Sequence, residues 1–190
     1  NEIPTDITLT STSVDENSPG ANIGIISGTD PDGDQLTYSI TGADADKFVV
    51  TGTTLSFASG HAADMEIKSA YTITLAASDG ALTYNKEFTI SVNDINEIPT
   101  DITLTSTSVD ENSLGANIGI ISGTDPEGDA LSYSIVAGGD ADKFVLDGTT
   151  NTLSFASGHA ADMETKSVYN ITLKATDVGG LTYDEDFTIN

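Results

Sequence analysis

The sequence predicts an all-β protein that consists of two tandem β-sandwich domains. One observation behind this prediction is a long internal repeat, and the other is a series of short segments in which apolar and polar residues alternate. A repeat of this length indicates an array of like modules rather than one domain. Alternation with a period of two is typical of strands that bury one face, and nothing longer than a turn has a helical pattern.

The repeat is nearly literal. The tetrapeptide Val-Asp-Glu-Asn at 14–17 returns at 109–112, and Asn-Glu-Ile-Pro at 1–4 returns at 96–99, in both cases 95 positions later. We therefore expect one domain at 1–95 and a second at 96–190. Because the chain opens within the repeated pattern, we expect a fragment of a longer array, whose second repeat stops before its own C-terminal linker.

About seven strands are expected in each repeat. In the first repeat they are indicated by Ile7 and Leu9; Ile23 and Ile25; Leu36, Tyr38 and Ile40; Phe48 and Val50; Leu55 and Phe57; Tyr71, Ile73, Leu75 and Ala77; and Phe88, Ile90 and Val92. The second repeat has the same series, including Ile118 and Ile120, and the best helical candidate in either is a single turn at 62–66 or its counterpart. About seven short strands in roughly 95 residues is the pattern of an immunoglobulin-like Greek-key β-sandwich.

Composition narrows the function. Thirty acidic residues against six basic ones give a formal net charge of −24, which disfavours nucleic acid because phosphate binding requires basic side chains. No apolar segment approaches the roughly 20 residues that span a bilayer, so no membrane insertion is expected. The absence of cysteine excludes disulfides and thiolate chemistry.

The acidic residues fall in short clusters at the same places in both repeats. The candidate ligands around the link between the repeats are Glu16, Asp64, Glu66, Asp94, Glu97, Asp125, Glu127, Asp129 and Asp177. Calcium takes six to eight oxygen ligands, and short Asp-x-Asp turns can direct alternate carboxylates to one point. Each turn alone is also an ordinary loop sequence, so the order of the motifs matters more than any one of them.

In order, the motifs are Glu-Asn after the first strand, an Asp-x-Asp turn, an Asp-x-Glu turn, an Ala-(Ser/Thr)-Asp strand end and an Asp-x-Asn-Glu-x-Pro linker. This order resembles the cadherin repeat, in its bacterial cadherin-like form, over both repeats. The resemblance implies an extracellular, calcium-dependent structural and adhesion module, with about two to three Ca²⁺ ions at the junction that stiffen a rod-like array. Calcium ions and neighbouring repeats of the same chain are the implied partners.

The resemblance also implies a ligand set. The first repeat supplies Glu16, Asp64 and Glu66; the linker supplies Asp94, Asn96 and Glu97, with backbone oxygen from around Ile95 and Ile98; the second repeat supplies Asp125, Glu127, Asp129 and Asp177. Glu97 and Glu127 stand where aspartate is usual, and Ile98 stands where a second asparagine is usual. Half of such a site is expected at each end of the chain, formed by Asn1, Glu2, Asp30, Asp32, Asp34 and Asp79, and by Glu111, Asp162 and Glu164. These halves should bind calcium weakly or not at all.

The sequence also contains residues that could suggest other functions. His61 and His159 precede an aspartate by three positions, but no cysteine completes a tetrahedral zinc site and the two lie in different repeats. No catalytic residue and no organic cofactor are expected, because a unique catalytic site should not occur twice in register. A polysaccharide-binding doublet stays open, with Tyr84 and Tyr183 as the candidate exposed aromatics. A passive spacer and a homophilic partner stay open as well.

Overall fold

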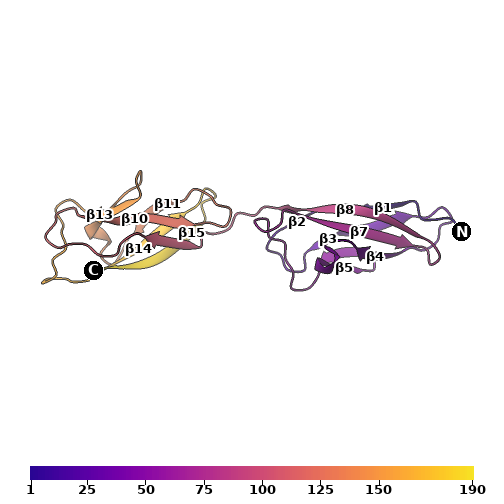
Figure 1. Ribbon diagram of the computed structural model, residues 1–190, viewed down its shortest axis with the longest axis horizontal. Helices are drawn as coiled ribbons and strands as arrows, with labels where there is room; N and C mark the ends of the chain where they lie inside the picture. The colour runs from indigo at the N-terminus through magenta and orange to yellow at the C-terminus, as the bar shows by residue number, and fades with distance from the viewer. The chain divides into compact units, whose positions relative to one another are not determined.

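The computed structural model describes all 190 residues and divides them into two compact units, Asn1–Ile95 and Asn96–Asn190. Both units are built from strands, as Figure 1 shows, with one three-residue 3₁₀ helix in each. The expected all-β fold is therefore confirmed. The helical turn is placed differently from the prediction, because 62–66 is a loop and turn, whereas the 3₁₀ helices are η1, Ala45–Lys47, and η2, Ala141–Lys143.

Unit 1 is a sandwich of two four-stranded sheets. One sheet has the order β1-β3-β6-β5 and the other β2-β8-β7-β4. The strands are β1 (Asp6–Leu9), β2 (Ser13–Asp15), β3 (Asn22–Thr29), β4 (Thr37–Thr41), β5 (Phe48–Thr51), β6 (Thr54–Phe57), β7 (Ala70–Ser78) and β8 (Thr83–Asn93). All neighbours pair antiparallel except β2, which pairs parallel with the end of β8. Among the strands of unit 1, β2 is the one that the alternation did not predict.

Unit 2 repeats the arrangement with sheets β9-β10-β13-β12 and β11-β14-β15. Its strands are β9 (Asp101–Leu104), β10 (Asn117–Thr124), β11 (Ser132–Val136), β12 (Phe144–Asp147), β13 (Thr152–Phe155), β14 (Tyr169–Thr176) and β15 (Thr182–Ile189). The counterpart of β2 is not a regular strand. Two backbone hydrogen bonds replace it, from Val109 N–H to the carbonyl of Asn190 and from Asn190 N–H to that of Thr107.

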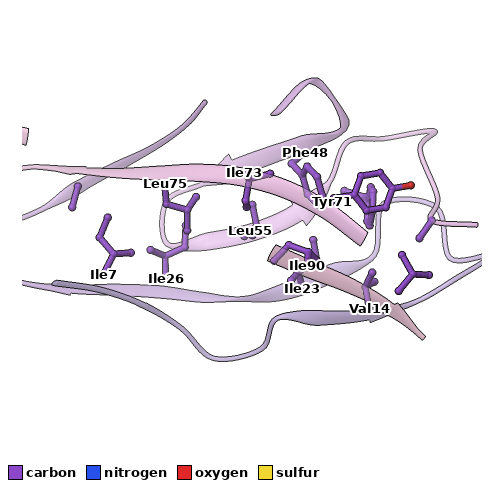
Figure 2. Close-up of a cluster of buried hydrophobic side chains, with 14 residues drawn as sticks. Ile7, Val14, Ile23, Ile26, Phe48, Leu55, Tyr71, Ile73, Leu75 and Ile90 are labelled. Atoms are coloured by element: carbon purple, nitrogen blue, oxygen red, sulfur yellow. The ribbon is translucent and has the colours of Figure 1, made fainter. Parts of the chain in front are cut away.

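The alternating residues form a separate core in each unit. Figure 2 shows Ile7, Ile26, Leu55, Ile73 and Leu75 between the layers of unit 1, and all five are essentially inaccessible. At the other end of this core the rings of Phe48, Phe57 and Tyr71 pack together, with Phe48 stacked on Phe57 at 4.6 Å and Tyr71 edge-on to both. Phe144, Phe155 and Tyr169 repeat this cluster in unit 2.

The predicted inward faces of β3 and β10 are wrong in one respect. Ile25 and Ile120 were expected to point inward with Ile23 and Ile118, but they are 43% and 52% exposed. The pairing register of β3 with β6 shifts between Asn22 and Gly24, and β10 has the same irregularity. A bulge inserts one residue and reverses the alternation after it, so Ile26 and Ile121 fill the core instead.

The loop before η1 is held by Asp44. Its Oδ1 accepts a charged hydrogen bond from Lys68, and its Oδ2 accepts the N–H of Thr72 at 2.7 Å. These two bonds hold the pKa of the Asp44 carboxyl below its ordinary value. Asp140, Lys166 and Asn170 form the same clamp in unit 2.

Asp44→Asn should lower the free energy of unfolding of unit 1 by about 1–2 kcal/mol at pH 7, since charged hydrogen bonds are lost. The folded-state pKa of Asp44 lies below the unfolded-state value. The stabilisation that the Asp44 carboxylate gives the wild-type protein is therefore complete above about pH 4. It is lost as the pH falls through the folded-state pKa, so the difference between the two proteins then disappears. Urea denaturation of both proteins from pH 7 to pH 2 measures this convergence. The exposed neighbour provides the control, because Asp46→Asn should change little, and a difference that persists at pH 2 would contradict the charge-based explanation.

Candidate metal centres

One buried carboxylate organises the end of unit 1 that contains its last residue, Ile95, which we call the lower end of the unit. The opposite end is called the upper end, and the same terms are used for unit 2. Glu16 is 3% exposed, its Oε2 accepts the N–H of Met65 at 2.7 Å, and its Oε1 accepts the N–H of Ile95 at 2.7 Å. A buried charge is tolerated when hydrogen bonds compensate its lost hydration. Glu16 thereby holds the Asp-Met-Glu turn and the last residues of the unit together.

Three predicted ligands meet at this end. Glu16, Glu66 and Asp94 each place a carboxylate oxygen within 4.8 Å of the others. Like charges this close repel one another, although the exposure of Glu66 and Asp94 lets salt screen part of the repulsion, and a bound cation would relieve it. Asp64 does not belong to this group, and its Oδ1 instead accepts the N–H of Ile67, which closes the turn. The N–H of Ile95 donates to Glu16, and the role of its backbone oxygen as a ligand stays a prediction.

The upper end of unit 2 gathers the predicted ligands that follow Ile95. The Asn96 side-chain amide donates to Oδ2 of Asp177 at 2.9 Å, and the N–H of Glu97 donates to Oε1 of Glu127 at 3.2 Å. Asp177 is 6% exposed. The acidic turn closes on itself, because Oδ1 of Asp125 accepts the N–H of Asp129 at 3.2 Å. Asp129 thus contributes its backbone to the shape of the turn.

Two buried oxygens in this turn have no hydrogen-bond donor. They are Oδ2 of Asp125 and Oε2 of Glu127. Desolvation raises the pKa of the Glu127 carboxyl above its ordinary value. Leaving a buried acceptor unsatisfied costs about 1–3 kcal/mol, and more when it is charged. An all-oxygen donor set of carboxylates and an amide suits a hard cation such as Ca²⁺, so the residues present fit the predicted ion.

The upper end of unit 1 has the same construction. Asn1 donates to Oδ2 of Asp79 at 3.1 Å, the N–H of Glu2 donates to Asp32 at 2.6 Å, and Oδ2 of Asp30 is buried without a donor. One carboxylate oxygen from each of Asp30, Asp32 and Asp34 lies within 4.8 Å of the others. Both repeats therefore bury a carboxylate oxygen without a hydrogen-bond donor in this turn. The second repeat keeps this feature although it has Glu127 where the first repeat has Asp32.

The lower end of unit 2 is looser than that of unit 1. Glu111 is exposed and accepts the N–H of Met163 at 3.1 Å, and Asp162 accepts the N–H of Thr165. Glu111, Asp162 and Glu164 do not converge as Glu16, Glu66 and Asp94 do. Met163 is 67% exposed, whereas Met65 packs against the core of unit 1.

The other candidate sites are not assembled. Neither His61 nor His159 belongs to a group of three converging metal-binding side chains. Tyr84 and Tyr183, predicted as exposed aromatics for a sugar, are half-buried and pack against the two cores. That prediction is wrong because each ring extends the inward face of its strand. No helix of the protein is long and apolar enough to cross a membrane.

The curated proteins that resemble this chain include protocadherins and cadherin-related proteins. The chain is 30% identical over 174 residues to mouse Protocadherin Fat 4, an alignment that covers 86% of the chain and 4% of that protein. It is 28% identical over 177 residues to chicken Cadherin-related family member 1, which covers 88% of the chain and 20% of that relative. The chain thus spans a small part of these relatives, and no family model matches it.

Solved structures support the fold. Human Protocadherin-24 EC1-2, form II, superposes with a TM-score of 0.72 at 24% identity and covers 97% of both chains. Protocadherin Gamma B2 extracellular cadherin domains 3-6 superpose with a TM-score of 0.69 at 19% identity and cover 97% of this chain and 47% of that one. The prediction of tandem immunoglobulin-like sandwiches is confirmed by this likeness.

Proposed function

Because the chain is a tandem of two cadherin-like repeats, we propose that it is a calcium-dependent structural and adhesion module of an extracellular protein. In this proposal, Ca²⁺ bound between the repeats fixes the angle between them. The activity is non-enzymatic, and its output is a stiff segment of a rod-like array. The family gives the general expectation of calcium binding and adhesion, and the residues of this chain support the particular site.

The unfilled oxygens of Asp125 and Glu127 carry the proposal. Folding has buried both atoms without giving either a donor. Such atoms are rare in proteins and call for an explanation, of which an ion is one. An ordinary surface cluster of acidic residues would leave its oxygens hydrated and would give no such signal.

Chain connectivity supports a shared site. Glu16, Glu66 and Asp94 converge in unit 1, and Asn96 pairs with Asp177 in unit 2. Ile95 alone separates Asp94 from Asn96, and two residues span at most about 7 Å. One member of each set, Asp94 and Asn96, is therefore held within about 7 Å of the other by the chain itself. We propose that Glu97, Asp125 and Glu127 complete the site, which would hold about two to three ions.

The mechanism is electrostatic. Without a cation, the carboxylates of Glu16, Glu66 and Asp94 repel one another. Bound Ca²⁺ supplies the positive charge that turns this repulsion into attraction. The side chains then bind from both repeats at once, and the backbone around Ile95 loses its freedom to rotate.

Calcium titration tests the proposal. Calorimetry should show a few sites with Kd of about 10⁻⁴–10⁻³ M, the range of extracellular modules. A concentration of 100 times Kd should add about 2.7 kcal/mol to the stability of the folded protein, so the melting temperature should rise by several degrees. Magnesium at the same concentration should have a smaller effect, because it requires near-octahedral geometry and gives up water reluctantly. An absence of both heat and thermal shift with calcium would overturn the proposal.

The same titration separates a stiffened array from a passive spacer. Residual dipolar couplings, measured separately for each unit, should give different alignment tensors without calcium and a common tensor with it. Binding that leaves the two tensors different would favour a calcium-loaded but flexible spacer. Polysaccharide binding has no support, because Tyr84 and Tyr183 are packed against the cores.

A further inference from the structure

The β14–β15 hairpin of unit 2 is one residue longer than its counterpart in unit 1. Between the aspartate and the leucine, unit 1 has only Gly80 and Ala81, whereas unit 2 has 178–180, Val-Gly-Gly. Both hairpins are closed in the same way, by an aspartate Oδ1 that accepts the leucine N–H at 2.7 Å in unit 1 and 2.9 Å in unit 2. The added residue therefore changes the path of the hairpin tip and leaves its base intact.

The longer tip brings the Gly179 backbone against Asn96. A Cβ placed on Gly179 would lie 2.8 Å from each of Cγ, Nδ2 and Oδ1 of Asn96. Three equal distances mean that the flat face of the amide is turned toward Gly179. In the shorter hairpin, a Cβ on Gly80 would meet nothing within 4 Å.

An added methyl group at Gly179 would displace the end of the Asn96 side chain, which is exposed. Its Nδ2 is bonded to Oδ2 of Asp177, which is itself buried. A Cβ at Gly179 would come closer than real Cβ contacts allow, so the amide would have to leave its place beside Asp177. Gly180 has a left-handed φ of 90°, but Gly179 is not among the positive-φ glycines, so alanine at 179 adds this contact without backbone strain.

We propose that Gly179 is a positioning residue for calcium, and that its bare Cα holds the amide of Asn96 beside Asp177. The inference rests on the proposed function, in which both side chains bind the ion. Residues that orient metal ligands typically contribute 10–100-fold to metal affinity. Gly179→Ala should therefore weaken calcium binding by about 10-fold.

The matched control is Gly148→Ala. Gly148 lies in a turn of the same unit, has no left-handed φ, and a Cβ there would meet nothing within 4 Å. This substitution makes the same chemical change with no contact to Asn96. Calcium affinity by calorimetry should be unchanged in Gly148→Ala, and both variants should unfold at the wild-type urea concentration in chelator.

A second readout needs no calcium. In chelator, the NMR resonances of the Asn96 side-chain amide, identified by their loss in Asn96→Ala, should shift in Gly179→Ala and stay in place in Gly148→Ala. In the Asn96→Ala background, Gly179→Ala should cost no further affinity, because residues that act through one contact are not additive. An additional 10-fold loss there would overturn the inference.

The outcomes distinguish this inference from the proposed function. Wild-type calcium affinity in Gly179→Ala would overturn the role of Gly179 and leave the calcium site standing. A wild-type protein that bound no calcium would remove the proposed function and this role with it. In that case a shifted Asn96 resonance would record only a packing contact.

Discussion

Replacement of Asp94 by alanine should reduce calcium affinity by 100-fold or more. Its carboxylate lies with those of Glu16 and Glu66, and it is the last acidic residue before the segment that belongs to unit 2. Removal takes away one full negative charge and one ligand that both repeats would share. A loss of 100-fold corresponds to about 2.8 kcal/mol, which is within the range for a ligand carboxylate. Calorimetry at constant ionic strength measures it.

Asp125 and Asp30 provide a matched pair for the same experiment. They occupy equivalent turns, and each has a buried Oδ2 without a donor. Asp125→Ala should weaken binding strongly, because the ligands of unit 1 precede it along the chain. Asp30→Ala should change the affinity of the occupied sites by no more than about twofold, since the acidic residues that lie with Asp30 all come from unit 1. Equal losses from Asp30→Ala and Asp125→Ala would show that ions bind within each repeat.

Glu16→Ala should be among the most destabilising substitutions in unit 1, even in chelator. It removes two charged hydrogen bonds, to the N–H groups of Met65 and Ile95, and leaves both donors without their partner. The expected loss is about 2–4 kcal/mol. Relief of repulsion from Glu66 and Asp94 opposes it, but those side chains are exposed and their charges are screened by salt. Urea denaturation followed by NMR signals from each unit measures the loss separately.

The second repeat contains the control for this change. Glu111 is the sequence equivalent of Glu16 but is exposed, with one longer bond, from Met163 at 3.1 Å. Glu111→Ala should cost less than about 1 kcal/mol in unit 2. Similar losses in the two units would mean that the bonds to Glu16 contribute no more than an exposed glutamate does.

Most of the sandwich could be predicted because its strands are half-buried and its turns are short. Leu55 and Phe57, or Tyr71 and Ile73, alternate with polar residues, and this pattern has one structural interpretation. Ile25 was assigned to the wrong face because a bulge reverses the alternation after it. Nothing in the residues around Gly24 requires a bulge, since isoleucines occur on both sides of the reversal.

The sequence predicts a set of candidate ligands but not the contacts between them. Asp94 and Glu66 come together as the repeated motifs indicate. The hydrogen bond from the Ile95 N–H to Glu16 could not be foreseen, because it depends on the path that the chain takes after β8. Gly179 escaped notice for a related reason. Its importance lies in an absent side chain, and the one available signal was the extra residue in its hairpin.

Hydrogen bonds on both sides of Ile95 leave few backbone bonds of this connection free to rotate. The N–H of Ile95 is bonded to Glu16, and the side chain of the next residue, Asn96, is bonded to Asp177. Peptide planarity leaves φ and ψ of Ile95 and φ of Asn96 as the backbone rotations between these anchors. A joint with so few degrees of freedom has little conformational entropy to lose when it is fixed. In the proposed function, a modest calcium affinity is then enough to fix this joint.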